Sequence, residues 1–120
     1  INPVSNHYIQ DIDSFFREVY RVLKKGGIFI AGLENEIFWA TNGETGKLEN
    51  KLPINPLLND ELYNRLVLEG NALQFSHTTV EQLNGQIKAG FVLRDMYDDT
   101  EEGVFEKLNI PTFIATLAVK

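Results

Sequence analysis

The sequence has no cysteine, which excludes disulfides, thiolate metal sites and cysteine nucleophiles. The absence of cysteine suits a reducing compartment, and we expect a cytoplasmic location. No run of about 18 apolar residues occurs, as a membrane-spanning helix would need. No basic segment is followed by a shorter apolar stretch, as in an export signal. We therefore expect neither a membrane partner nor an export signal. The first residue is Ile1 and not Met, so we expect either a fragment of a longer protein or a processed product.

Histidine is also scarce, with His7 and His77 seventy positions apart. A histidine metal site would need carboxylates to complete it. The one acidic cluster lacks the regular glycine and acid spacing of a calcium loop, so a solvated turn is expected there and no metal site is predicted. The cluster consists of Asp98, Asp99, Glu101 and Glu102.

Positive charge is in deficit, with 11 Lys and Arg against 17 Asp and Glu, a net charge of −6. This balance disfavours binding to nucleic acid or to anionic membranes. The hydrophobic share of 43% and the charged share of 23% are typical of a soluble globular protein. At 120 residues the chain predicts a single domain, 1–120.

A helix is predicted directly after Asp11, whose side chain can cap it. Apolar residues at 12, 15, 16, 19, 22 and 23 form one stripe. Lys24 and Lys25 suit the negative end of the helix dipole, and Gly26 and Gly27 end the helix. Residues 1–10 are interpreted as a loop because of the Asn2-Pro3 turn signal.

The continuous apolar run Ile28–Leu33 predicts a strand buried on both faces, as in a parallel sheet between helix layers. Residues 34–54 leave two alternatives open, a hairpin that returns through Leu48–Ile54 or a short helix at 34–40. A brief helix capped by Asn59 or Asp60 is expected to reach Val67, with Leu62 and Leu66 facing inward.

The C-terminal third begins with a capping box, Thr78 to Glu81, which predicts a helix to Ala89 with a stop at Gly90. Strands are predicted for Phe91–Tyr97 and Thr112–Val119.

These elements resemble the class I S-adenosylmethionine-dependent methyltransferases, in which a helix ending Glu-x-x-Arg-x-Leu-Lys-Pro-Gly-Gly leads into a buried strand. The matching residues are Glu18, Arg21, Leu23, Lys24, Gly26 and Gly27, with Lys25 in place of proline. Later landmarks of the same kind are Phe75-Ser76-His77-Thr78, Ala89-Gly90-Phe91 and Pro111-Thr112-Phe113.

The resemblance implies an α/β fold, a partial Rossmann-like methyltransferase sheet. Its last three strands would be Ile28–Leu33, Phe91–Tyr97 and Thr112–Val119, the final one antiparallel between the other two. The chain would be the C-terminal part of the domain, with 34–76 as an insertion or lid. The glycine-rich cofactor loop would lie upstream, since no G-x-G spacing occurs here.

The same resemblance places the segment after the fourth family strand next to the reacting groups. Asn2, Pro3 and Ser5 would contact S-adenosylmethionine, and His7 would act as a general base toward a hydroxyl acceptor. The residues predicted to bind a small-molecule substrate are Asn6, Tyr8, Phe38, Trp39 and His77.

The implied function is scaffold and substrate-side wall of a small-molecule methyltransferase, with no activity in the fragment itself. The alternative from the residues is a free-standing α/β binding or interaction module. The edge of strand 28–33 would be open without upstream strands, so we expect self-association there or cover by residues 34–54.

Overall fold

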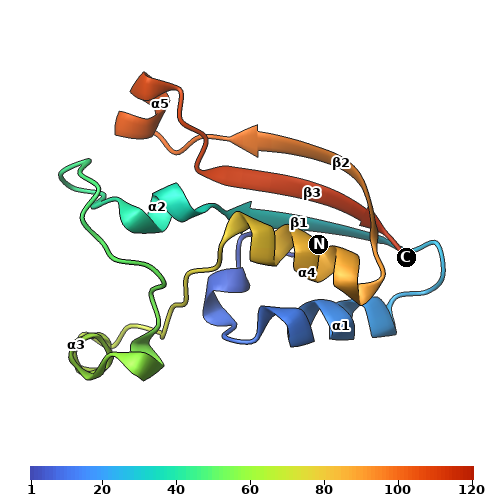
Figure 1. The fold of residues 1–120 in the computed structure, drawn as a ribbon, viewed down its shortest axis with the longest axis horizontal. Coiled ribbons are helices and arrows are strands. Elements are labelled where there is room, and N and C mark those ends of the chain that lie inside the picture. The colour runs from blue at the N-terminus through green and yellow to red at the C-terminus, as the bar shows by residue number, and fades with distance from the viewer.

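A computed structural model describes all 120 residues, 1–120. Three strands and a set of helices and short turns follow one another along the chain (Figure 1). In order they are η1 (Asn6–Tyr8), α1 (Ile12–Val22), β1 (Ile28–Glu34), α2 (Glu36–Ala40), η2 (Pro56–Leu58), α3 (Asp60–Leu68), α4 (Thr79–Ala89), β2 (Val92–Asp99), α5 (Val104–Leu108) and β3 (Phe113–Val119).

The sheet has the order β1-β3-β2, with β3 antiparallel to both neighbours. Val119 is paired with Ile28 on one side and with Val92 on the other, so β1 and β2 run parallel. This is the predicted fold class, an α/β sheet whose last strand is inserted antiparallel between the two before it.

The core lies between the sheet and the helix pair α1 and α4. The Asp11 side chain accepts a hydrogen bond from the Ser14 backbone N–H and caps α1 as predicted. Phe16 is fully buried and packs with Phe29 of β1. Across from it, a Cβ at Gly85 of α4 would lie 2.7 Å from the Phe16 ring, so only glycine permits this close helix contact.

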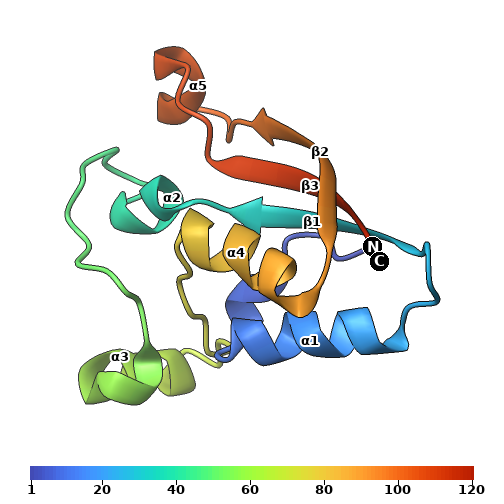
Figure 2. The same cartoon turned by 45° about the vertical axis from the view of Figure 1, so that its right-hand side comes forward.

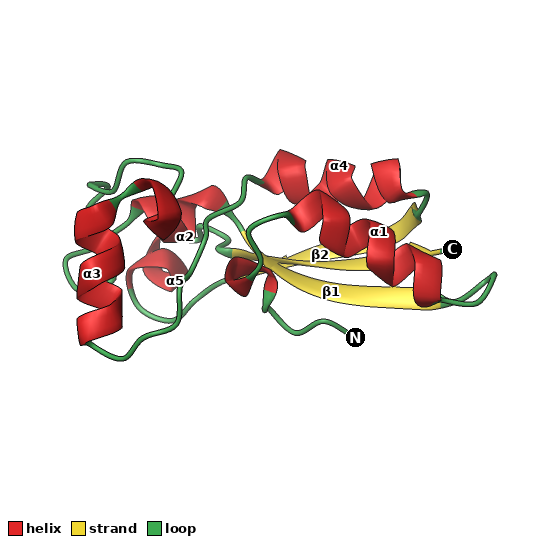
Figure 3. Cartoon of the chain, turned by 90° about the horizontal axis from the view of Figure 1, so that it is seen from below, coloured by secondary structure: helices red, strands yellow, loops and turns green.

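The prediction that β1 is buried on both faces is wrong. Phe29, Ala31 and Leu33 are buried, whereas Ile28 and Ile30 are 57% and 40% exposed. Figure 3 shows the reason: α1 and α4 both lie on the same side of the sheet and leave its other face open. The apolar run therefore supplies a buried face and an open apolar face.

Residues 1–10 contain no strand and only the short turn η1, as the loop interpretation predicted, but one of them, Asn2, pairs with the edge of β1. Asn2 donates its N–H to the Ile30 carbonyl at 2.8 Å and accepts from the Gly32 N–H at 2.8 Å, in a parallel bridge. A Cβ at Gly32 would lie 2.8 Å from the Val4 side chain, so glycine permits this approach. The expected cover of this edge by residues 34–54 is wrong.

The 35–76 segment contains α2, which supports the helix alternative at 34–40 over the hairpin. One isolated bridge, Thr41 to Leu48, joins the limbs of the following turn. The predicted helix is present as α3, with Asn59 accepting from the Leu62 N–H. No residue of α3 is buried, and Figures 1 and 2 both show α3 apart from the sheet.

Beyond this segment, Thr78 and Glu81 form the predicted capping box, and Gly90 ends α4 with a left-handed backbone. Asp98 and Asp99 belong to β2, not to the predicted acidic loop, because β3 pairs with them. The short helix α5 was not predicted. None of the helices combines the length and the apolar composition of a membrane-spanning segment.

Candidate functional site

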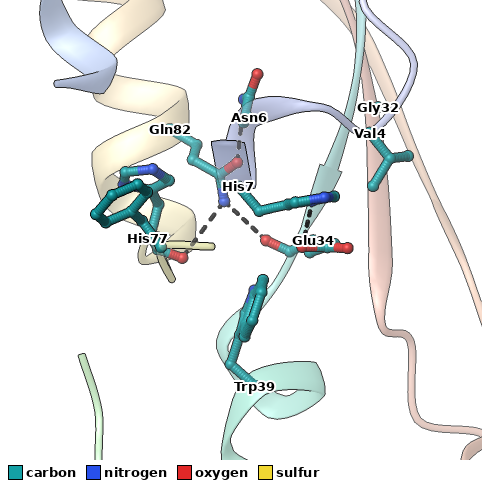
Figure 4. A pocket seen from close by; sticks show the side chains of 9 residues that line it. Val4, Asn6, His7, Gly32, Glu34, Trp39, His77 and Gln82 are labelled. Carbon is teal, nitrogen blue, oxygen red and sulfur yellow. Dashed lines mark hydrogen bonds and ion pairs between the residues drawn. The ribbon is translucent and has the colours of Figure 1, made fainter. Parts of the chain in front are cut away.

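A polar corner forms where β1 ends. Glu34 is the last residue of β1, and His7 follows the edge residues Asn2–Val4 within η1, so the chain brings both side chains to the same end of the sheet (Figure 4). In α/β sheets, ligands collect at the carboxyl ends of parallel strands. A cavity of about 10 Å³, the room of about one water molecule, is lined by Val4, Asn6, His7, Gly32, Glu34, Trp39, Phe75, His77 and Gln82.

Four predicted site residues meet at this corner: Asn6, His7, Trp39 and His77. Tyr8 is 53% exposed and lies with its ring 4.1 Å from that of His7. Phe38 points elsewhere and packs against Phe113 of β3, with ring centroids 5.8 Å apart.

The predicted cofactor residues Asn2, Pro3 and Ser5 do not line this cavity. The Asn2 side chain is buried and is engaged by the Ser5 hydroxyl and by the Asn6 amide. Asn2 and Ser5 therefore brace the loop that carries His7.

His7 and Glu34 form the central pair of the corner. His7 Nδ1 lies 3.2 Å from Glu34 Oε2, and the two side chains are 14% and 10% exposed. Nδ1 is fully enclosed and makes no hydrogen bond of good geometry. The contact therefore brings a ring nitrogen and a carboxylate together with only room for a proton between them.

Burial dominates the proton affinities of this pair. It raises the pKa of Glu34 to about 7, with Glu101 adding repulsion and a hydrogen bond from Trp39 opposing the rise. Burial also lowers the pKa of His7, helped by the nearby His77. Both directions disfavour a charged pair, since isolated charges are costly away from water. A neutral imidazole beside a carboxyl group that titrates near neutral pH is the expected state.

His77 has a defined tautomer. Its Nε2 lies 2.7 Å from the Ile9 carbonyl oxygen. A carbonyl oxygen only accepts, so Nε2 must carry the proton. His77 is therefore held as a hydrogen-bond donor to the loop before α1, directly before the α4 cap Thr78.

A buried amide network ties the His7 loop to α4 and to the sheet. Asn6 donates to Gln82 Oε1 at 3.2 Å, and Gln82 Nε2 donates to the Glu34 carbonyl at 2.7 Å. Gln86 donates to the Gln82 carbonyl and accepts from the Thr116 hydroxyl at 3.1 Å. Because buried amides without partners are costly, this network holds the loop in a single position.

A larger cavity of about 370 Å³ shares Phe75 and His77 with the corner. Ligand sites in proteins typically have volumes of about 300–1,000 Å³. Its lining includes the apolar residues Leu52, Pro53 and Ile54 and residues at the start of α4. Two carboxylates, Glu36 and Glu81, also line it, and both already cap the start of α4.

Comparison with known proteins bears on this arrangement. A family model described as a methyltransferase domain matches residues 2–31. An uncharacterized methyltransferase of Bacillus subtilis, YbaJ, is 32% identical over 127 residues, which cover all of this chain and 49% of that protein. The resemblance to methyltransferases is confirmed. The chain spans about half the length of the curated relative it matches.

Solved structures give the same fold. An S-adenosylmethionine-dependent methyltransferase of Mesorhizobium loti matches 98% of this chain and 59% of its own, with a TM-score of 0.67 and 22% identity. A protein of Listeria monocytogenes, proposed to be a methyltransferase of the same kind, matches 98% and 58% with a TM-score of 0.66 and 22% identity. The chain therefore has a methyltransferase-like fold that corresponds to part of the length of these two proteins.

Sequence reasoning did not predict two polar residues of the corner, Glu34 and Gln82. Glu34 is an acidic residue at the end of an apolar strand, a position where ligands collect in parallel sheets, so its place was a usable signal. Gln82 has no such signal, because a glutamine within a helix is typical of a solvated face.

Proposed function

We propose that this chain forms the scaffold and the acceptor-side wall of an S-adenosylmethionine-dependent methyltransferase that acts on a small molecule. The observation that carries the proposal is the polar corner of His7 and Glu34 at the carboxyl end of β1, in a methyltransferase-like sheet. The 32% identity to a methyltransferase over the whole chain supports the same class of reaction.

The acceptor would occupy the 370 Å³ cavity, whose volume lies within the range typical of small-molecule sites. Leu52, Pro53, Ile54 and Phe75 in its lining would contact a planar or apolar part of the acceptor, and the seven polar lining residues would face its polar groups. Trp39 lines the neighbouring corner, so it and Phe75 would contact the acceptor. The 35–76 segment, which carries all of these residues, would act as the lid.

The residues present do not by themselves fit the cofactor. The side chains of Asn2 and Ser5 are used within the loop, and the corner cavity of about 10 Å³ is far too small for a nucleoside. We therefore propose that the cofactor is held mainly outside these 120 residues, and that the chain alone neither binds it tightly nor transfers a methyl group.

The test uses the intact protein and the 120-residue chain side by side. Isothermal titration with S-adenosylmethionine should give binding for the intact protein and none at micromolar concentration for the chain. A screen of small hydroxyl and amine acceptors should then give a methylated product with the intact protein. Micromolar binding by the chain, or no product from a cofactor-saturated intact protein, would contradict the proposal.

We also propose that the chain self-associates through the edge of strand 28–33. Asn2 covers the middle of this edge, but Ile28 and Ile30 present apolar side chains on the adjoining open face. Exposed apolar residues beside a partly covered strand edge favour association with another chain. Light scattering at rising concentration should show a growing mass, and a strict monomer would refute the interface.

Nucleic acid, membrane and metal play no part in the proposal, and the proposed location is cytoplasmic.

A further inference from the structure

The orphaned ring nitrogen of His7 is the observation that leads beyond the proposed function. Nδ1 is the one fully enclosed side-chain nitrogen or oxygen without a hydrogen-bond partner. Its nearest acid is the Glu34 carboxylate at 3.2 Å, on a side chain that is nine-tenths buried (Figure 4). Buried polar groups without partners are costly and are seldom retained without a role.

The other nitrogen of the ring has a different environment. Nε2 of His7 makes no hydrogen bond within the chain. It is also not fully enclosed, because Nδ1 is the one enclosed side-chain atom without a hydrogen-bond partner. A neutral imidazole carries one proton, and the partner of one nitrogen decides which nitrogen carries it. With the proton on Nδ1 toward Glu34, the lone pair of Nε2 is left free.

We propose that Glu34 is a positioning residue that holds neutral His7 in its Nδ1–H form, so that Nε2 is the proton acceptor toward an O–H or N–H group of the methyl acceptor. This inference rests on the proposed function. It assigns a role to Glu34 and specifies which atom of His7 reacts.

The proton step balances within the residues present. The acceptor O–H or N–H bond breaks, its proton moves to Nε2, and the electron pair stays on the acceptor oxygen or nitrogen. The imidazolium keeps its Nδ1–H on the Glu34 carboxylate, which compensates the new positive charge. His7 later returns the proton to solvent.

Several groups face this pair and set the pH at which it works. Glu101, which follows β2, repels the Glu34 charge, and Trp39 of α2 stabilises it. His77, which precedes α4, lies close enough to His7 to disfavour its charging. Since the pKa of Glu34 is raised to about 7, the carboxylate accepts from Nδ1–H above that pH. Below it, a protonated Glu34 donates to Nδ1 instead, and the proton of His7 moves to Nε2.

The test is long-range proton–nitrogen NMR of the 120-residue chain labelled with ¹⁵N-histidine, recorded from pH 5.5 to 9. We expect His7 in the Nδ1–H form above pH 8 and a reversal toward Nε2–H as the pH falls through 7. Glu34→Leu removes the acceptor and should leave His7 in the Nε2–H form at every pH at which it is neutral. His77 is an internal control, because the Ile9 carbonyl holds its proton on Nε2 in every variant.

An Nε2–H form of His7 at pH 8 in the wild-type chain would overturn the inference, as would an unchanged tautomer in Glu34→Leu. The pH dependence adds a second check, since Glu34→Gln keeps a carbonyl acceptor but cannot titrate, and should abolish the reversal. Dispersed backbone signals in each variant establish that it folds.

Activity separates this inference from the proposed function. In the intact protein at pH 8, Glu34→Leu should lower kcat by about 10- to 100-fold, with KM changed less. This is below the roughly 100- to 10,000-fold contribution of a general base itself, because Glu34 acts only through His7. Methyl transfer that is unaffected by Glu34→Leu refutes the positioning role and leaves the proposed function intact. The expected tautomers without any methyl transfer refute the proposed function and leave the tautomer assignment intact.

Discussion

The body of the chain and its 35–76 segment are held by different means. In the body, α1 and α4 enclose a continuous apolar core against β1 and β3, in which Phe16, Ala31 and Ala118 are fully buried. In the 35–76 segment, α3 buries no residue, and Leu68 is 87% exposed. The polar corner lies where the two regions meet. Under the proposed function, the well-packed body would carry His7 and Glu34, and the less buried 35–76 segment beside them would admit the acceptor.

The largest loss of stability should come from a substitution in the core of the body. Phe16→Ala removes a fully buried ring between Phe29 and Gly85 and leaves a cavity. We expect a loss of about 3–5 kcal/mol in the free energy of unfolding, measured by urea titration. A loss below about 1 kcal/mol would mean that the α1–α4 contact is not the centre of stability.

A pH-dependent effect is expected where the regions meet. The pKa of Glu34 is raised from 4.5 to about 7, so the folded state binds more protons than the unfolded state between these values. Stability should therefore fall as the pH rises through this window, by on the order of 2 kcal/mol. Glu34→Gln should abolish this fall, so its stability relative to the wild type should grow from pH 5 to pH 8.

The control for this comparison is Glu18→Gln, which alters an exposed pair with Arg21. Its stability difference from the wild type should show little pH dependence over the same range. The lowered pKa of His7 acts in the opposite direction, because stability is then lost as the pH falls below 6.5. His7 is common to all three proteins, so the difference between variants isolates Glu34. Equal pH profiles for all three would contradict the burial of this carboxylate.

The next largest loss of stability should come from a substitution in the buried amide network. Gln82→Leu leaves the Asn6 amide and the Glu34 carbonyl without partners in a buried place. We expect a loss of about 1–3 kcal/mol and changed NMR signals for His7, whose loop the network holds. Asn84→Ala alters an exposed residue of the same helix and is the matched control. If both variants shift His7 equally, the network does not position the loop.

The smallest change in stability should come from a substitution in the 35–76 segment. Leu68→Ala changes a side chain of α3 that is 87% exposed, and we expect a change within about 0.5 kcal/mol in the unfolding free energy. A loss comparable to that of Phe16→Ala would show that α3 belongs to the cooperative core, and the contrast between the two regions would no longer hold.

The sequence by itself determined the elements whose signals are local. Asp11 and the apolar stripe predicted α1, Thr78 and Glu81 predicted the start of α4, and Gly90 predicted its end. Caps and glycine stops depend on hydrogen bonds and backbone angles within a few residues, so a local pattern suffices. The strand order followed from the family resemblance, and His7 and His77 were predicted for the site from the same resemblance.

Only the tertiary structure decided the rest. An apolar run such as Ile28–Leu33 does not reveal whether one or both faces are covered, because that depends on where α1 and α4 pack. Asn2 pairs with β1 across nearly thirty residues of chain, and Glu34 meets His7 across a similar distance. Such contacts arise from the folding of the whole sheet, and their burial, which sets the proton affinity of Glu34, leaves no local pattern in the sequence.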